Sequence, residues 1–381
     1  SVACANEWKH GICYKPQIKC SDCKSRQLLP ITQEVLYSHL TGQKVIGIYP
    51  LLATDQCRLL AVDFDKSDWK NCVTAFSEAC LSLNIPFLVE RSRSGNGAHV
   101  WIFFSEPIAA KQARLMGAGI LDKAMELYPA LDFESYDRMF PNQDHMPAGG
   151  FGNLIALPLQ KHARALGNST FIDSNFNAFT DPWTVLQQTE LMSSSEVNNI
   201  VNELGYNFIE QNQTDVDHEA PWVKNIPKKN QKIAGCPDAI ELVFANMIHI
   251  PIQTLPSQLI AQLKRLATFS NPRFFKAQAM RFSTTGIPRH ICCARLEGQY
   301  LSLPRGCLTD IIHLLNQQDT KIKLKDQRTK GNILVNINLL TELSSEQEMA
   351  CKKILEHDVG VLHAPTAFGK TVTAISIICL L

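Results

Sequence analysis

The sequence predicts an α+β protein in which helices cover a β-sheet. Residues 58–65 (RLLAVDFD) form an apolar run typical of a strand, residues 68–83 carry apolar side chains at helical spacing, and residues 85–90 predict a second strand. A glycine-rich turn at 94–97 then precedes a third strand at 100–104. A strand, a helix and a pair of hairpin strands in this order indicate a sheet with helices packed on it, not a helical bundle.

Further elements follow along the chain. Residues 109–127 have helical periodicity, and residues 153–159 predict another strand. A later stretch, 321–330 (KIKLKDQRTK), contains five basic residues and one Asp. We divide the chain into five segments: a cysteine-rich module at 1–30, an α/β domain at 31–190, a polar linker at 191–235, an accessory domain at 236–340, and a last segment at 341–381.

Composition narrows the class of protein. The chain has 381 residues, and its 45% of hydrophobic residues argues against a disordered chain. The 37 basic and 36 acidic side chains leave a net charge of +1, so local clusters must hold any polyanion.

Apolar runs are too short for a bilayer span and no signal-peptide pattern opens the sequence, so we expect a cytoplasmic protein without a membrane partner. The start at Ser1 and the apolar end at 375–381 suggest a piece of a longer polypeptide.

Thirteen cysteines are present, and four of them crowd into the first 23 residues. Cys4, Cys13, Cys20 and Cys23 follow the pattern C-x8-C-x6-C-x2-C. The C-x2-C pair lets one turn present two thiolates to a tetrahedral metal, and the other two complete a four-sulfur set. The sequence therefore predicts a closed, structural zinc site, with an iron–sulfur cluster as the competing interpretation. We expect most of the other cysteines to be small buried thiols.

Two carboxylates, Asp63 and Asp65, end the first predicted strand. Strand side chains alternate, so both point to the same side of the sheet. Adjacent carboxylates repel each other unless a cation neutralises them, and Mg²⁺ prefers oxygen ligands together with substrate phosphates. The D-x-D pattern alone is a weak signal, because acids are common at strand ends and sugar-nucleotide transferases and nucleases also use such pairs.

The hairpin that follows carries groups suited to an anion. Its sequence at 90–101, ERSRSGNGAHVW, combines glycines that permit close backbone approach with cationic and hydroxyl side chains. A lone histidine in an apolar strand is more often a hydrogen-bonded core residue, but this one follows S-G-x-G. The sequence therefore predicts a triphosphate site at Arg91, Arg93, Ser94, Gly95, Gly97 and His99.

The two patterns together resemble the first two motifs of archaeo-eukaryotic primases, a superfamily that includes eukaryotic primase, PrimPol and the polymerase domain of bacterial end-joining ligases. The resemblance is closer to the primase of TOTE conflict systems, which are predicted defences against mobile elements. It covers the cysteine module, ERSRSGNGAHVWIFF, SYDRMFPNQD and GGFGNLIALPLQ, and so most of residues 1–190. It implies an RRM-like catalytic core and template-directed nucleotidyl transfer, with single-stranded DNA as the template and NTPs or dNTPs as substrates.

The resemblance also implies further site residues. A third metal-binding acid is expected within SYDRMFPNQD, and we choose Asp137, with Asp132 and Asp144 as rivals that the spacing leaves open. Together with the D-x-D pair, this acid would hold two Mg²⁺ or Mn²⁺ ions. The end of the strand at 153–159 is expected to supply basic contacts to the nucleotide. The further nucleotide-binding residues implied are Arg138, Gln160 and Lys161.

Residues 364–371 (APTAFGKT) resemble the Walker A loop of superfamily-two helicases, although Ala364 replaces the usual first glycine. They follow a predicted helix at 345–357 and a predicted strand at 360–363, and they open a helix. In the TOTE branch the primase is fused to a helicase, so the remainder of that polypeptide is the implied partner. Few residues follow the loop, and we do not expect it to hydrolyse ATP in this chain. The implied ATP-binding residues are Gln347, Gly369, Lys370 and Thr371.

Two functions from other classes remain open. One is a catalytically silent nucleic-acid-binding adaptor that delivers the helicase. The other is a metal-dependent nuclease that uses the same acids. The segment 271–276 mixes aromatic and basic residues, which suits contact with a DNA strand and ordinary packing equally well.

Overall fold

The computed structural model describes residues 4–15, 17–18, 20, 22–65, 67–129, 131, 138–148, 150–204, 232–284, 286–329, 339–357 and 360–380. The chain forms two compact units. The first contains Ser1–Ile233 together with Pro256–Cys292, and the second contains Ala234–Leu255 and Cys293–Leu381. The residues of the predicted accessory domain are thus shared between both units. As functional divisions, the five segments expected from the sequence stay predictions.

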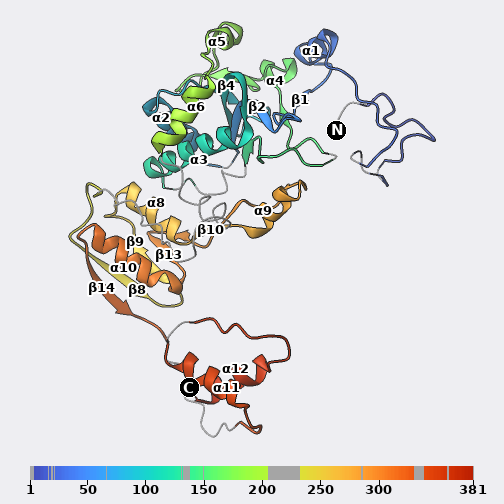
Figure 1. Cartoon of the computed structure of the whole chain (residues 1–381). Helices are drawn as coiled ribbons and strands as arrows, with labels where there is room; N and C mark the ends of the chain where they lie inside the picture. The colour runs from blue at the N-terminus through green and yellow to red at the C-terminus, as the bar shows by residue number, and fades with distance from the viewer. Residues whose placement is uncertain are drawn as a thin grey trace. The chain divides into compact units, whose positions relative to one another are not determined.

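A five-stranded antiparallel sheet with the order β5-β2-β4-β3-β7 organises the first unit (Figure 1). Helix α2 (Trp69–Ser82) connects β2 to β3, and helix α3 (Ala110–Leu127) connects β4 to β5. This β-α-β-β-α-β connectivity is the split β-α-β arrangement, and it agrees with the expected α+β class. The strands are β2 (Gln56–Phe64), β3 (Leu88–Arg91), β4 (Ala98–Ala109), β5 (Met139–Phe140) and β7 (Thr170–Ile172).

Alternation along β2 divides the sheet into two unlike faces. Leu60 and Val62 point toward α2 and α3 and are fully buried in the larger hydrophobic core. Ala61 points the other way and joins Trp101 of β4 in a second, smaller core. Because Asp63 is two residues beyond Ala61, it lies on the face that α2 and α3 do not cover.

Short elements cover the second face. Strand β1 (Gly47–Ile48) pairs with β6 (Ile155–Ala156) in a sheet of its own. The predicted strand at 153–159 is therefore much shorter than expected. Pro158, which has no N–H to donate, and Leu159, with φ +69°, end its extended backbone. The helices of this part are α1 (Gln33–Leu40), α4 (Lys161–Ala165), α5 (Pro182–Gln188) and α6 (Ser194–Leu204).

A later segment returns to the first unit. Helix α8 (Ser257–Leu266) packs against α3, and buried Lys264 donates hydrogen bonds to the carbonyl oxygens of Pro129 and Leu131. The segment continues through β10 (Thr268–Ser270), α9 (Pro272–Ala279) and β11 (His290–Cys292). A buried charge is tolerated only when it is paired or hydrogen-bonded. The hydrogen bonds of Lys264 therefore mark the contact between α8 and the first unit as a specific interface.

The second unit contains a five-stranded sheet with the order β12-β13-β9-β8-β14. Its edge strand β14 (Lys321–Asp326) holds most of the predicted basic stretch and pairs in parallel with β8. Exposed lysines on an edge strand discourage pairing with other chains. The other elements of this sheet unit are β8 (Ala239–Phe244), β9 (Ile248–Pro251), β12 (Arg295–Glu297), β13 (Tyr300–Leu303) and α10 (Leu308–Gln317).

The C-terminal part of the second unit contains α11 (Ser345–Leu355) and α12 (Lys370–Leu380), which pack against each other. The predicted strand at 360–363 is wrong, because these residues have no strand conformation. A strand needs a neighbour that shares its hydrogen bonds, and no described segment of the chain pairs with this one. Among the described helices of both units, none has the length and apolarity to cross a membrane.

Candidate active site

Asp63 and Asp65 converge on one guanidinium group. Arg138 Nη1 lies 3.5 Å from Asp63 Oδ2 and also contacts Asp65 Oδ2. Burial, reinforced by the neighbouring Asp65, raises the pKa of Asp63, although His99 and Arg138 act in the opposite direction. The cations present therefore do not fully compensate the two carboxylates. Such a pair fits a divalent metal ion, which would bring more charge to the same oxygens.

His99 lies between two acids from neighbouring strands. The strand register sets Glu90 of β3 and Asp63 of β2 directly on either side of it. His99 Nδ1 is 2.9 Å from Glu90 Oε2, and Nε2 is 3.6 Å from Asp63 Oδ1. Burial would lower the pKa of His99, but the hydrogen bond and charge of Glu90, with the charges of both aspartates, raise it. The Nε2 side of the ring is turned toward Asp63.

Glu90 was not predicted as a site residue. It is only 2% exposed, and its carboxylate also accepts hydrogen bonds from Trp101 Nε1 at 2.9 Å and Ser169 Oγ at 3.4 Å. These contacts fix the carboxylate and, through Nδ1, the orientation of the His99 ring. The turn pattern alone did not show this pairing, because counting outward from a turn at 94–97 sets residue 92 opposite residue 99. The loop in the structure spans residues 92–97, and Arg91 pairs with Ala98, so Glu90 lies opposite His99.

The glycine turn between β3 and β4 presses against the acid-bearing strand. A Cβ atom at Gly97 would lie 2.6 Å from the carbonyl oxygen of Phe64. Gly95 has φ +81°, a conformation that L side chains rarely adopt. Ser94 is exposed, and its hydroxyl lies 3.1 Å from that of Ser92. Packing against β2 is therefore a second reason for glycine at position 97, beside close approach to an anion.

The other predicted nucleotide contacts are spread over the first unit. Arg91 donates a hydrogen bond to the carbonyl oxygen of Phe176 at 2.5 Å. Gln160 is buried and caps α4, with Oε1 accepting from the N–H of Ala163 at 3.1 Å. The side chains of Arg93 and Lys161 are exposed. Roles for these four residues in nucleotide binding stay predictions.

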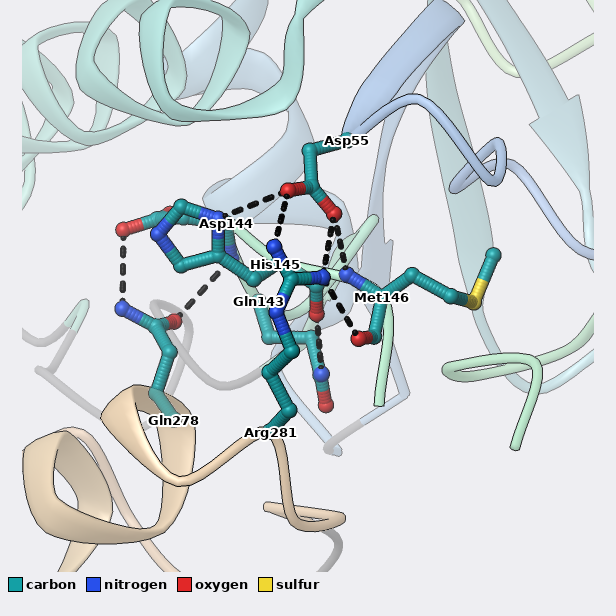
Figure 2. A network of polar contacts seen from close by, with 7 residues as sticks. All are labelled: Asp55, Gln143, Asp144, His145, Met146, Gln278 and Arg281. Atoms are coloured by element: carbon teal, nitrogen blue, oxygen red, sulfur yellow. Dashed lines mark hydrogen bonds and ion pairs between the residues drawn. The ribbon is translucent and has the colours of Figure 1, made fainter. Parts of the chain in front are cut away.

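Of the three candidates for the third acid, only Asp144 lies within the described residues. Asp137 and Asp132 lie outside the described residues. Asp144 is 5% exposed and forms ion pairs with Arg114 Nε at 3.0 Å and Arg289 Nη2 at 3.6 Å. Its carboxylate also accepts a hydrogen bond from Gln278 Nε2, as Figure 2 shows. These contacts favour a structural role for Asp144.

A cavity of about 600 Å³ adjoins the acids. Asp63 and Arg138 line part of it, together with Phe140, Asn142 and Asn153. This volume lies within the range of about 300–1,000 Å³ in which proteins hold small ligands. Asp63 therefore faces a space large enough for a nucleotide.

All thirteen cysteines lie within the described residues, and none of them forms a disulfide. Cys4, Cys13, Cys20 and Cys23 line one small cavity of about 20 Å³. Within the described residues, however, no three or more Cys, His, Asp or Glu side chains are arranged as a metal-ligand group. The shared cavity agrees with the expected grouping of the thiols, and the zinc itself stays a prediction.

In the second unit, the Walker A-like loop contacts α11. Gln347 Nε2 donates to the carbonyl oxygen of Phe368 at 2.7 Å, and Gln347 also closes a capping box with Ser344. Lys370 Nζ donates to the carbonyl oxygens of Ala364 and Pro365 at 3.0 and 2.8 Å. The predicted ATP-binding residues thus lie together, with Gly369 (φ +84°) before the first turn of α12 and Thr371 within it.

The split β-α-β sheet carries Asp63 and His99 on its central strands and Asp65 directly after β2, and this arrangement suits a domain that binds nucleotides together with metal ions. The family model described as "TOTE conflict system, Archaeo-Eukaryotic Primase domain" matches residues 1–200. The match spans more than half of the chain, so the chain belongs to this family. No curated protein matches it. Membership supports nucleotidyl transfer in general terms.

Proposed function

We propose that the first unit is a DNA primase-polymerase, which transfers nucleotides from NTPs or dNTPs to a growing strand on a single-stranded DNA template and releases pyrophosphate. One observation carries the proposal: in a primase-family domain, Asp63, Asp65 and Arg138 converge beside His99 and next to a nucleotide-sized cavity. These are the charges that phosphoryl transfer requires.

The proposed mechanism assigns a task to each group. Asp63 and Asp65, with Asp137 as the proposed third ligand, would hold Mg²⁺ or Mn²⁺, which supplies positive charge to the triphosphate and acidifies the attacking hydroxyl. Arg138 pairs with both acids, and it would turn to a phosphate oxygen if a metal ion took its place. Glu90 orients His99, whose Nε2–H would bind a second phosphate oxygen.

The test uses the purified chain, a defined single-stranded template, a labelled primer and, separately, no primer. Each nucleotide set is supplied with Mg²⁺ or Mn²⁺. Longer labelled products support nucleotidyl transfer. A shortened strand would instead identify a nuclease, and binding without either change would identify an adaptor.

Replacing His99 with Ala should weaken nucleotide use far more than DNA binding. A hydrogen bond to a charged group is worth roughly 1.5–3 kcal/mol, or about 10- to 150-fold in apparent affinity. Steady-state incorporation against nucleotide concentration measures this effect. The matched control is His313→Ala, which removes an exposed histidine of α10 in the second unit. An unchanged nucleotide dependence would leave His99 as a structural residue.

We further propose that Cys4, Cys13, Cys20 and Cys23 bind one structural zinc ion, on the support of their common cavity and spacing. Elemental analysis should find one zinc per chain and less zinc after Cys20→Ser, while Cys292→Ser, at an exposed cysteine, should leave the zinc content unchanged.

Deleting residues 1–25 should suppress primer-free synthesis but spare primer extension, because only initiation lacks a primer to anchor the first nucleotide. Equal loss of both activities in a folded core would indicate a general DNA clamp instead.

We also propose that residues 341–381 begin a helicase ATP-binding domain, because Gln347 contacts the Walker A-like loop directly. Lys370 would bind the β- and γ-phosphates, and Thr371 would ligate Mg²⁺. In a longer chain with the complete helicase, Lys370→Ala should abolish ATP hydrolysis and leave nucleotide incorporation intact. ATP hydrolysis that persists in this variant would contradict the assignment.

A further inference from the structure

The cavity beside the acids has lining residues from beyond the matched family domain. Phe274 of α9 and the residues Thr284, Ile287 and Pro288 of the following loop contribute to it. The family model ends at residue 200, so it does not include this part of the cavity. We call Phe274, Thr284, Ile287 and Pro288 the distal wall.

Polar contacts fix α9 and the loop after it, which carry the distal wall, to the primase domain, and Figure 2 shows those of Gln278 and Arg281. Gln278 of α9 donates from Nε2 to Asp144 Oδ2 at 3.0 Å and accepts from the Asp144 N–H at 3.0 Å. Thr284 donates to Gln143 Oε1 at 3.1 Å, and both side chains are 1% exposed. At the rim, Arg281 pairs with Asp55 at 2.9 Å. Because unpaired buried polar groups are costly, these contacts hold the wall in one position.

The lining has the chemistry of a nucleoside site. Phe140, Leu154 and Ile287 offer apolar surface to the faces of a flat ring, and Phe274, which is 2% exposed, backs this surface. Asn142 Oδ1 is buried without a hydrogen-bond partner among the described residues, so it could accept from a donor on the edge of a base. Asp63 and Arg138 belong to the same lining and are the groups to which phosphates and their metal ions bind.

We propose that the distal wall binds the base and sugar of a nucleotide whose phosphates reach the Asp63–Arg138 end of the cavity. This inference deepens the proposed function and rests on it. Two sources offer the same chemistry: the incoming nucleoside triphosphate, and the terminal nucleotide of a DNA strand. In either case, a segment outside the family domain completes the substrate site.

The test is the full chain with Ile287→Ala, a substitution at a half-buried residue of the wall. Equilibrium binding of a fluorescent nucleoside triphosphate with Mn²⁺, and separately of a labelled single-stranded oligonucleotide, requires no turnover. The dissociation constant of one probe should rise by about 5- to 30-fold, as expected for lost apolar contact. A change for the triphosphate identifies the incoming nucleotide as the occupant, and a change for the oligonucleotide identifies the strand terminus.

Phe282→Ala is the matched control, because Phe282 is an exposed apolar residue of the same loop and does not line the cavity. It should leave both dissociation constants unchanged, and thermal melting should show that both variants are folded. A second variant, Ile287→Trp, places a larger side chain in the cavity and should weaken the binding of the same probe.

Unchanged binding of both probes to Ile287→Ala and Ile287→Trp would overturn the inference about the wall. That result is separable from failure of the proposed function. If the wall inference fails alone, substitution of Asp63 still removes incorporation. If the proposed function fails alone, substitution of Asp63 has no effect on incorporation, while weaker nucleotide binding by Ile287→Ala still supports a nucleoside site.

Discussion

Asp63→Asn is expected to abolish nucleotide incorporation without unfolding the protein. The substitution removes one negative charge where Asp63, Asp65 and Arg138 meet and where a metal ion would bind. Substituting outer partners of metal ligands costs about 10- to 100-fold, so loss of a direct ligand should exceed about 100-fold. Primer extension over a range of Mg²⁺ and Mn²⁺ concentrations measures the effect. Asp65→Asn should behave in the same way.

Although Asp63→Asn should lose activity, its melting temperature should not fall. The pKa of Asp63 is raised in the folded protein, so its ionised form is disfavoured relative to the unfolded chain and costs stability above the unfolded pKa of about 3.9. At neutral pH without added metal, the variant should therefore melt no lower than the parent. Asp181→Asn, at the cap of α5, is the matched control and should keep full activity. Normal extension by Asp63→Asn would refute the assignment of the acids.

Asp144→Asn is expected to lower the free energy of unfolding by about 3–5 kcal/mol, the usual result when one member of a buried ion pair is removed. Arg114 and Arg289, 2% and 3% exposed, would lose the charge that compensates them. For a unit of this size, we expect a melting temperature lower by about 6–20 °C. Circular dichroism during heating measures it.

The matched control for Asp144 is Arg281→Gln, which breaks the half-exposed pair with Asp55 in the same interface. An exposed pair is worth at most about 1 kcal/mol, so its effect should be small. Equal effects of the two substitutions would contradict the structural role of Asp144.

The pH dependence of stability tests the same network. Burial alone would raise the pKa of Asp144, but Arg289, Arg114 and Gln278 lower it below the ordinary value. The pKa of Asp55 is likewise lowered, to about 2, because the Met146 N–H, Arg281 and His145 outweigh its desolvation. Both groups thus stabilise the fold above about pH 4, and this contribution is lost as the pH falls through their folded pKa values. The gap between parent and Asp144→Asn should narrow on acidification.

Three strands of the central sheet, β2, β3 and β4, could be predicted from the sequence because their signals are local, whereas the short strands β5 and β7 were not predicted. The apolar run of β2 and the periodicity of α2 and α3 can be recognised without knowledge of distant residues. The return of α8 and α9 to the first unit could not be predicted in this way. Lys264 and Arg289 read as ordinary basic residues in the sequence, and only the fold shows that they are buried against distant partners.

The candidate site was predictable to a similar extent. Asp63, Asp65 and His99 stand in short patterns, and strand register brings them together. Gln160 matched a pattern, but the structure uses it as a helix cap, a role that depends on where α4 begins. Glu90 was overlooked because a single acid in a strand matches no sequence motif. Its role follows from its hydrogen bond to His99, its neighbour across the hairpin.

The path of the chain between its two units has an evolutionary consequence. The backbone leaves the first unit before Ala234, re-enters it at Pro256 and leaves again after Cys292. A recombination event that exchanged the primase at the end of its homologous region would leave behind Arg289 and Gln278, which are partners of Asp144. Successful exchanges should therefore carry the stretch up to Cys292 with them. The unit that is inherited would then be longer than the unit that sequence similarity recognises.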